Sequence, residues 1–573
     1  MAGKALIPDF GWLRAYDLAA GTRDIIAGLI LAILLVPQAM AYAQLAGLPP
    51  ESGLFAALLP PVLYLVFGTS MFVSMGPVAL VSLVVAEAVA DHDPGQAAMI
   101  VGLQAGLLLL LLGALGLGRI VNFISEPVLL GFTAAAAFLI ATSQLPTLLG
   151  IEADRAGDLP GALSALFGGM GGLQPVTAVI GAAALLILLL ANRFAGPALW
   201  KMGVHPPYRQ ALAKSLPLLV IIGCALVAQA VPAGVPKVQS VETGLPALAL
   251  PSLDPDLWLD LLPGSIAVAL IVFVLATAVA KSLAGTDRRH LDTSREAVAI
   301  GTGNIAAALT GGYAVGASLS RSALLEDSGA RSRLASVVGS AVVLLVLLVL
   351  APLLAYLPRT ALAALVISAV FGLVKVRAIG EVWRHDRLEG AIVAIAFLAT
   401  LFLGVRMGLA IGAGAGLAHF LWFSSMPRVT RIGTDDGGIS FRSVRRDEVE
   451  IDTLPALVVR VDRSLYFANA AYCEDEIFAR LGNHEGVECL ILDMRAVNAV
   501  DASGSAMLRR LAEKLRFDGV TVRIAAAHGP VHEALAPLKS EQVTFHRTVG
   551  QALEACGVYQ AGETDHGLPK KSS

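Results

Sequence analysis

The residues best suited to chemistry in this 573-residue chain are an arginine and two serines inside an otherwise apolar region. Ser318, Ser320 and Arg321 follow the Gly-rich stretch 311–317. An arginine within a membrane segment costs at least about 2.5 kcal/mol and by default indicates function, and the neighbouring hydroxyls can donate hydrogen bonds to an anion. Alternatively, Arg321 extends to the aqueous interface or pairs with a carboxylate such as Glu326.

A second interruption lies in the first half of the chain, at residues 73–79, which include Gly76 and Pro77. Gly316 marks the corresponding point of the later stretch. Paired interruptions in the two halves of a membrane protein indicate a transport site built from broken helices. If both breaks open into half-helices, their N-termini offer partial positive charge and free backbone N–H groups to an anion. Alternatively, the glycines only permit close helix packing.

The first apolar run contains a third candidate group. Pro37 frees a backbone carbonyl within a helix, and Gln38 and Tyr42 stand four residues apart on one helix face. Their amide and aromatic ring could face a bound ion. The alternative is a kinked helix that holds a hydrogen-bonded core glutamine.

Charged residues are unevenly distributed along the chain. They number 46 in residues 1–425, which is 11%, and 39 in residues 426–573, which is 26%. Soluble proteins carry roughly 25%, so the first part has membrane composition and the second soluble composition. The net charge of −3 indicates no nucleic-acid partner. The four cysteines show no CxxC spacing, so we expect no metal, no cofactor and no disulfide framework.

Uncharged runs of roughly the 20 residues that span a bilayer recur through residues 25–425 and predict about 14 segments. If the segments alternate, 18 of the 23 Lys and Arg residues in 1–425 lie on one side, which the positive-inside rule assigns to the cytoplasm. Residues 1–24 lack the apolar region of a cleaved signal peptide. We therefore expect a multi-pass protein of the cell (inner) membrane with both termini cytoplasmic.

The pattern changes at about residue 440. Strand-like runs at 454–461, 487–494 and 520–527 alternate with helical patterns at 470–481, 503–517 and 530–538. Such alternation predicts a small α/β domain. We place this domain at 451–560, with a linker over 426–450 before it and a disordered tail over 561–573 after it.

Together these residues resemble the SulP family of anion transporters, the sulfate permeases whose relatives include bicarbonate transporters and prestin. The C-terminal part resembles a STAS domain, the module shared with bacterial anti-sigma-factor antagonists. The strings that carry the resemblance include Pro37-Gln-Ala-Met-Ala-Tyr-Ala43, Gly47-Leu-Pro-Pro50, Ser74-Met-Gly-Pro77, Ser125-Glu-Pro127, Gly303-Asn304, Ser320-Arg-Ser322, Leu490-Ile-Leu-Asp493 and Val500-Asp-Ala-Ser-Gly504.

The resemblance implies 14 segments in a seven-plus-seven inverted repeat, divided into a core and a gate domain that move like an elevator. Family members are commonly homodimers. The substrate would lie between the starts of the half-helices of segments 3 and 10. The positions carried over to this site are Gln38, Tyr42, Val78, Ala79, Thr277, Ser318, Ser320 and Arg321, with Val78 and Ala79 offering backbone N–H groups.

One departure from the family bears on coupling. Relatives that resemble proton- or sodium-coupled symporters carry a carboxylate six residues before the Lys of a Lys-Ser-Leu-Ala string. Here the string begins at Lys281 and the matching residue is Leu275, with no Asp or Glu in 261–280. The absence favours exchange or uniport. Glu87 and His419 are weak alternative proton carriers, and Glu87 fits a structural role better.

The STAS-like region holds one candidate regulatory residue. In the antagonists, the serine of the Asp-x-Ser-Gly motif is phosphorylated, and Ser503 occupies that position. A phosphate there would lie at a helix N-terminus, where the dipole favours it. The alternative is a plain helix cap by Asp501 or Ser503.

The sequence therefore predicts a secondary transporter of small anions, of the sulfate, bicarbonate, chloride or dicarboxylate class, and no enzyme. The first alternative is a proton- or sodium-coupled anion symporter. The second, from another class, is a membrane-anchored sensor or scaffold that presents the STAS domain to a soluble partner.

Overall fold

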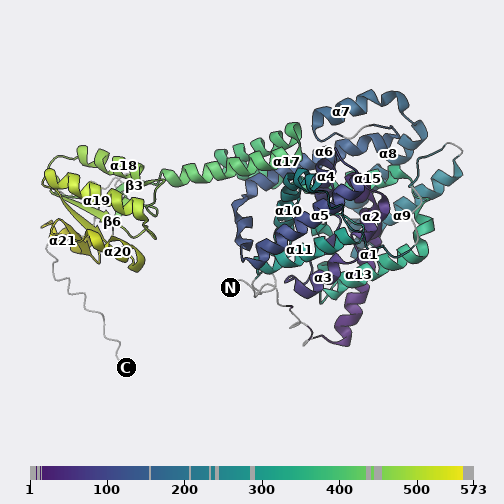
Figure 1. Cartoon of the computed structure of the whole chain (residues 1–573), viewed down its shortest axis with the longest axis horizontal. Coiled ribbons are helices and arrows are strands. Elements are labelled where there is room, and N and C mark those ends of the chain that lie inside the picture. Colours follow the sequence, from purple (N-terminus) through teal and green to yellow (C-terminus); the bar gives the residue numbers. More distant parts are fainter. Residues whose placement is uncertain are drawn as a thin grey trace. The chain divides into compact units, whose positions relative to one another are not determined.

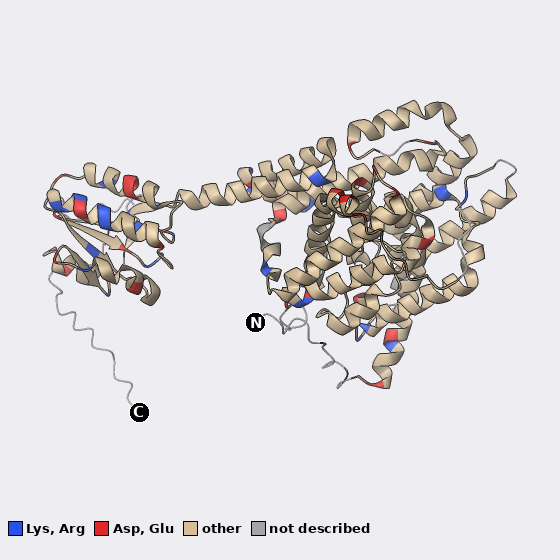
Figure 2. Ribbon diagram, viewed as in Figure 1, with Lys and Arg blue, Asp and Glu red and all other residues tan. Residues whose placement is uncertain are grey.

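The computed structural model describes Pro8, Leu13 and residues 16–153, 156–204, 208–231, 234–238, 244–283, 291–433, 441–443 and 455–558. The chain forms two compact units, Met1–Gly416 and Leu417–Ser573 (Figure 1). Figure 2 shows that Lys, Arg, Asp and Glu are sparse along the helices of the first unit, whereas residues of both charges are frequent in the second. The expected tail at 561–573 lies outside the described residues.

The first unit is helical. Among the described residues, ten helical stretches are long and apolar enough to cross a membrane. Four helices begin at an aspartate whose side chain accepts a backbone N–H of the first turn, namely Asp17, Asp93, Asp158 and Asp292. The helices that lie wholly in this unit are α1 (Leu18–Ala46), α2 (Pro50–Phe55), α3 (Pro60–Phe67), α4 (Ala79–Ala88), α5 (Pro94–Ala114), α6 (Glu126–Leu149), α7 (Leu159–Gly168), α8 (Pro175–Lys201), α9 (Tyr208–Ala230), α10 (Pro255–Leu283), α11 (Thr293–Leu309), α12 (Leu319–Asp327), α13 (Leu334–Leu345), α14 (Ala351–Leu354), α15 (Arg359–Val370) and α16 (Val376–His385).

Two helix pairs from distant parts of the sequence pack closely through glycines. Helix α5 lies along α11, where Gly106 and Gly301 approach so closely that a Cβ on Gly301 would lie 2.7 Å from the carbonyl oxygen of Gly106. Helix α1 lies along α13, where a Cβ on Gly28 would lie 2.6 Å from the carbonyl oxygen of Ala335. Side chains at these glycines would separate the helices.

The last long helix of this unit, α17 (Arg387–Ser425), is a pair of limbs that continues into the second unit. Gly404 breaks it with φ 86° and ψ 173°, a conformation that favours glycine. A Cβ on Gly408 would lie 2.1 Å from Thr400 Oγ1, and one on Gly412 would lie 3.0 Å from the Cβ of Ala396. Residues at equal distances before and after Gly404 therefore face each other, and the limbs are antiparallel.

The second unit is built on a six-stranded sheet with strand order β4-β3-β5-β6-β7-β8. Strands β5 to β8 pair in parallel, and β3 pairs antiparallel with β5. Alternate strand residues face two apolar layers: α18, α19 and α20 cover one face, and α21 covers the other. The elements are β3 (Val429–Gly433), β4 (Arg442–Ser443), β5 (Ala456–Val461), α18 (Ala470–Gly482), β6 (Cys489–Asp493), α19 (Ala502–Phe517), β7 (Thr521–Ala525), α20 (Gly529–Leu535), β8 (Val543–His546) and α21 (Val549–Ala555).

The three strands and three helices expected here are present as β5 to β7 and α18 to α20, within a few residues of the expected bounds. The range 426–450, expected to be a linker, contributes β3 and β4 to the sheet. Strand β3 pairs with the buried strand β5, so its residues Val429 and Ile432 are part of the core. Strand β8 and helix α21 were not predicted.

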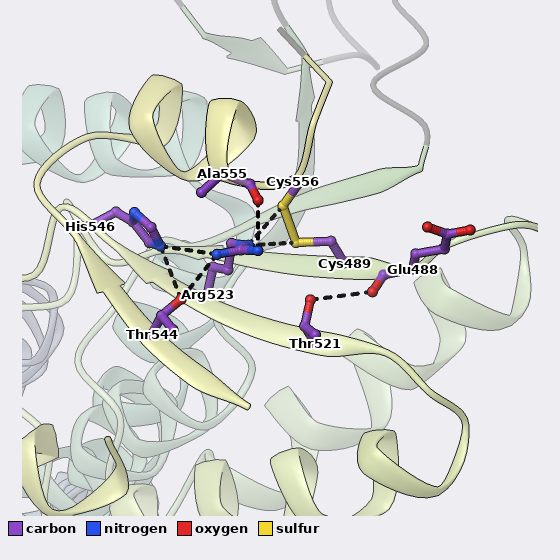
Figure 3. Close-up of a disulfide and its surroundings, with 8 residues drawn as sticks. All are labelled: Glu488, Cys489, Thr521, Arg523, Thr544, His546, Ala555 and Cys556. Carbon is purple, nitrogen blue, oxygen red and sulfur yellow. Dashed lines mark hydrogen bonds between the residues drawn. A yellow bond between two sulfur atoms is a disulfide. The ribbon is translucent and has the colours of Figure 1, made fainter. Parts of the chain in front are cut away.

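The cysteines also differ from expectation. Cys489, the first residue of β6, forms a disulfide with Cys556, which directly follows α21 (Figure 3). The cysteine spacing, which indicated no disulfide framework, therefore did not reveal this pair. Their sequence separation of 67 residues carries no local spacing signal, and the two meet because α21 packs on β6 and β7. Arg523 of β7 lies beside the disulfide, with Nε 3.2 Å from the Cys489 sulfur and 3.0 Å from the Cys556 sulfur (Figure 3).

Candidate functional site between two broken segments

The two interruptions meet as a short antiparallel ladder. Strand β1 (Met75–Gly76) pairs with β2 (Gly316–Ala317), with Met75 opposite Ala317 and Gly76 opposite Gly316. The N–H of Ser318 donates to the carbonyl oxygen of Ser74 at 3.2 Å. This ladder satisfies backbone groups that would otherwise be unpaired at the breaks. It also places the starts of α4 and α12 beside each other.

Arg321 lies in the first turn of α12, directly after β2. Its side chain extends to the other interrupted segment, between β1 and α4. Its side chain is fully buried. Nη1 donates to the carbonyl oxygen of Pro77 at 2.8 Å and to Gln38 Oε1 at 3.4 Å, and Nε donates to Ser74 Oγ at 3.4 Å. One guanidinium therefore connects α1, the β1–α4 break and α12.

One nitrogen of this guanidinium has no protein partner. Nη2 is buried and donates to none of the described residues. Nη2 lies 3.3 Å from the point that a Cβ on Gly76 would occupy. A side chain at position 76 would therefore crowd the guanidinium, and glycine avoids this contact. Among the described residues, no carboxylate forms an ion pair with Arg321. A buried cation that has no carboxylate partner among the described residues, and that has N–H donors to spare, can form charge-assisted hydrogen bonds with an anion.

The alternatives considered for the embedded charges can now be compared with this geometry. Arg321 is buried against Pro77 and does not extend to an interface, and Glu326 is not paired with it among the described residues. Glu87, at the end of α4, accepts the N–H of Val405 at 2.8 Å and pairs with Arg406 at 3.0 Å. Glu87 thus fixes the turn between the limbs of α17, which is a structural role.

Helix α1 contributes the two predicted side chains beside Arg321. Gln38 and Tyr42 are 5% and 6% exposed, and Pro37 lies within the same helix. The Gln38 side chain uses its oxygen to accept from Arg321, which leaves its amide N–H groups as donors. The structure therefore brings Gln38 and Arg321 into direct contact.

The starts of the two half-helices differ in how they are capped. Val78 is the N-cap of α4 and provides no side-chain hydrogen bond, so the first-turn N–H groups beginning at Ala79 are free of a side-chain cap. Helix α12 is capped by Ser318, whose hydroxyl accepts the N–H of Arg321 at 3.4 Å. The α4 start is thus the more available of the two to an anion.

The remaining predicted hydroxyls occupy different surroundings. Ser318 and Ser320 have their hydroxyl oxygens 3.3 Å apart, and Ser320 is exposed. Thr277 on α10 is buried and donates its hydroxyl to the carbonyl oxygen of Phe273 in its own helix at 2.7 Å. Its oxygen retains only acceptor capacity there, so Thr277 is poorly placed to donate to an anion.

Sequence reasoning missed several residues that hold the site together. Ser322 Oγ accepts the N–H of Ser74 at 2.9 Å, and the hydroxyls of Ser82 and Tyr313 lie 2.8 Å apart. Asn304 on α11 both accepts from and donates to the backbone of Val315, at 2.8 Å and 3.1 Å. Asn304 and Ser322 belong to the strings Gly303-Asn304 and Ser320-Arg-Ser322, which were therefore a usable signal.

In the second unit, Asp501 is the N-cap of α19 and accepts the N–H groups of Gly504 and Phe467 at 2.8 Å and 2.9 Å. The hydrogen bond from Gly504, with others from backbone N–H groups, lowers the pKa of Asp501. Ser503 lies in the first turn and is partly exposed. The cap expected from Asp501 or Ser503 is thus Asp501.

Comparison with known proteins decides the family. Residues 22–396 match the Sulfate permease family, and residues 446–552 match the STAS domain. The chain belongs to the sulfate permease family. Its relatives include "Sulfate transporter 4.1, chloroplastic" of Arabidopsis thaliana, 31% identical over 97% of this chain and 83% of the relative, and "Sulfate transporter 2.2" of the same plant, 31% identical over 99% and 87%.

Solved structures share the fold of this chain. The murine Slc26a9 anion transporter in its inward-facing state aligns with a TM-score of 0.85 at 20% identity, over 96% of this chain and 93% of that one. The transmembrane domain of the cyanobacterial bicarbonate transporter BicA aligns with a TM-score of 0.58 at 20% identity, over 70% and 98%. The expected family, the helical membrane fold with a STAS domain and the membrane-transport function are confirmed, and the family is one of transporters, not of enzymes.

Proposed function

We propose that this sulfate permease carries small anions of the sulfate, bicarbonate, chloride or dicarboxylate class by alternating access. The observation that carries the proposal is Arg321, a buried cation whose Nη2 group has no partner and which, among the described residues, forms no ion pair with a carboxylate. Relatives named as sulfate transporters, and a structural neighbour named as a bicarbonate transporter, support this substrate class.

The anion is held between the starts of α4 and α12. The backbone N–H groups of Val78 and Ala79 approach it from α4, and the hydroxyls of Ser318 and Ser320 approach from α12. Gln38 offers amide donors and Tyr42 its ring edge from α1. Arg321 supplies the net positive charge, and its bond to Pro77 keeps that charge beside the α4 start.

The membrane arrangement follows from the elements. Eight helices each form one span, namely α1, α5, α6, α8, α9, α10, α11 and α15. Four pairs of short elements form one span each, namely α2 with α3, β1 with α4, β2 with α12, and α13 with α14. The two limbs of α17 add two more, which gives fourteen spans. An even number keeps both termini on one side, which the Lys and Arg distribution assigns to the cytoplasm of the cell (inner) membrane. The two breaks then occupy the third and tenth spans, as a seven-plus-seven inverted repeat requires. The working form is a homodimer, and Ser503 is a phosphorylation site that regulates it.

Exchange or uniport is the coupling mode that the residues favour. Leu275 lines a small apolar cavity of about 10 Å³ with Leu80 and Thr133, next to the start of α4. No carboxylate or histidine is among the residues that line it. Glu87 is paired with Arg406, and the His419 ring stacks on Phe423.

Uptake of labelled sulfate, bicarbonate and a dicarboxylate into proteoliposomes tests the proposal. Each anion is measured with and without a proton or sodium gradient, and with and without internal anion. Stimulation by internal anion alone supports exchange. Dependence on a cation gradient favours the symporter, and a stoichiometric soluble partner for the second unit with no flux of any anion favours the scaffold.

A further inference from the structure

The disulfide of the second unit lies beside a positive charge. Cys489 begins β6, and Cys556 directly follows α21, which packs on β6, β7 and β8. The Arg523 side chain extends from β7 to the disulfide, and its Nε is close enough to donate to both sulfurs (Figure 3). A guanidinium in this position stabilises a negative charge on either sulfur.

Groups other than the sulfurs hold this guanidinium in place. Its Nη2 donates to the carbonyl oxygen of Ala555 at 2.8 Å. Its Nη1 donates to Thr544 Oγ1 at 3.3 Å and lies 3.4 Å from His546 Nε2. Among the described residues, Arg523 forms no ion pair with a carboxylate, and Figure 3 shows the Glu488 carboxylate turned away from it. The charge therefore stays beside the sulfurs when the disulfide opens.

Cys473, the other cysteine described in this unit, has different surroundings. It lies on α18, is fully buried and forms no disulfide. Burial, and then the charge of Glu476, raise the pKa of its thiol to about 12. Because the thiolate is the reactive form of cysteine, Cys473 is inert at neutral pH and serves as an internal reference for the other pair.

The two bonded sulfurs differ in their access to solvent. Cys489 is 3% exposed, whereas Cys556 is partly exposed. A thiol in solution therefore reaches Cys556 first. On the proposed topology the second unit lies in the cytoplasm, where disulfides are usually transient and take part in redox chemistry.

We propose that Cys489 and Cys556 form a reversible thiol–disulfide exchange site for small thiols of the glutathione class, and that Cys556 is the sulfur they modify. The thiolate of the small thiol attacks Cys556 Sγ and forms a mixed disulfide. The bond between the two cysteines breaks, and its electron pair leaves on Cys489 Sγ as a thiolate beside Arg523.

A second molecule of the small thiol completes the reaction. It attacks its own sulfur in the mixed disulfide, which releases the oxidised dimer of the small thiol and leaves Cys556 reduced. Two cysteines gain two electrons from two small thiols, whose protons pass to the cysteines or to water. In the reverse direction, the Cys489 thiolate attacks the mixed disulfide on Cys556 and restores the bond. This chemistry is independent of the proposed transport function.

The first test uses the full-length protein in detergent with reduced glutathione. Free thiols are blocked with N-ethylmaleimide, glutathione is added at millimolar concentration under native conditions, and acid-quenched samples are mapped by mass spectrometry. We expect glutathione on Cys556 and a new free thiol at Cys489, while Cys473 stays protected in samples that were not blocked beforehand. Glutathione on Cys489 instead, or a disulfide that opens only when Cys473 also becomes reactive, would overturn the proposal.

Single-cysteine variants identify the modified sulfur in a second way. With oxidised glutathione, Cys489→Ser should form the adduct on Cys556 at least ten-fold faster than Cys556→Ser forms it on Cys489, because the Cys489 sulfur is shielded from solvent. Equal rates in the two variants would overturn the assignment of Cys556.

Replacement of Arg523 tests the role of the charge. A cation beside a thiol increases the fraction of thiolate but weakens it as a nucleophile, so the net gain in rate is about three-fold. In the Cys489→Ser protein, Arg523→Gln should therefore slow iodoacetamide alkylation of Cys556 about three-fold at neutral pH, and Arg523→Lys should retain most of the rate. The control Arg509→Gln removes an exposed cation of α19 and should have no effect. Slow alkylation of Cys473 verifies that each variant is folded, and an unchanged Cys556 rate in folded Arg523→Gln would overturn this role.

Discussion

Replacement of Arg321 by alanine tests the proposed site most directly. The side chain is fully buried, and its Nη1 lies 2.8 Å from the carbonyl oxygen of Pro77. The next backbone N–H along the chain belongs to Val78, the proposed anion contact. The substitution therefore removes the positive charge nearest to the proposed anion without changing the backbone donors.

The size of the effect follows from Coulomb's law. An anion bound to the N–H groups of Val78 and Ala79 lies about 6 Å from the guanidinium, where two unit charges at an effective dielectric constant of 20 interact by about 3 kcal/mol. That energy corresponds to about a hundred-fold loss of affinity. Arg321→Lys keeps the charge and loses the fork that reaches Pro77, Ser74 and Gln38, so we expect about a ten-fold loss.

The assay compares sulfate affinity in Arg321→Ala, Arg321→Lys and the control Glu87→Gln. Affinity is measured as KM in proteoliposomes and as sulfate-dependent thermal stabilisation in detergent, which needs no transport. The Glu87–Arg406 pair is 43% exposed on its arginine side, so its loss should change sulfate affinity less than three-fold. If Arg321→Ala and Glu87→Gln lose affinity equally while both proteins stay folded, the site is misplaced.

Three further predictions concern stability. Tyr313→Phe removes the bond between buried Tyr313 and Ser82 and should lower the free energy of unfolding by about 1 kcal/mol, whereas Tyr356→Phe on an exposed tyrosine should not; equal unfolding midpoints for both in detergent would contradict this. The Cys489–Cys556 bond joins residues 67 positions apart, so its reduction should lower the free energy of unfolding of the second unit by up to about 4 kcal/mol, if the bond acts by reducing the entropy of the unfolded chain. Thermal unfolding of a 417–573 fragment with and without dithiothreitol measures this difference, and identical unfolding curves would refute the prediction. Burial, and then the Arg523 guanidinium, lower the pKa of His546 from 6.5. Because the folded state binds the proton less well than the unfolded state, the free energy of unfolding should be retained above pH 6.5 and fall as the pH drops toward the lowered pKa. Denaturant titrations at several pH values should show that His546→Gln flattens this dependence.

The sequence predicted those site residues that differ in type from the apolar residues around them. Arg321, Pro77 and Gly316 stand out because charges, prolines and glycines are unusual in apolar runs. The ladder between β1 and β2 could not be predicted, because two-residue strands have no periodicity and their partners lie about 240 residues apart. Without that pairing, the contact from Arg321 to Pro77 could not be inferred either.

The same limit applies to the second unit. Strands β5 and β6 are buried on both faces and appear as nearly continuous apolar runs, and the apolar residues of β7 are buried as well. Strand β3 has two inward residues and polar neighbours, so its pattern resembles a linker. Cys489 and Cys556 carry no pairing signal at all, since the packing of α21 alone brings them together.

The β1–β2 ladder also constrains how the protein can be made. The segment that carries Arg321 is short, and α12 adds Glu326 and Asp327 to it, so it enters a bilayer poorly by itself. Its partners Ser74, Pro77 and Gln38 are synthesised more than 240 residues earlier, and the backbone of Met75 and Gly76 has no ladder partner until β2 arrives. We therefore expect the β1 backbone to stay without its ladder partner until the segment that carries β2 and α12 has been inserted.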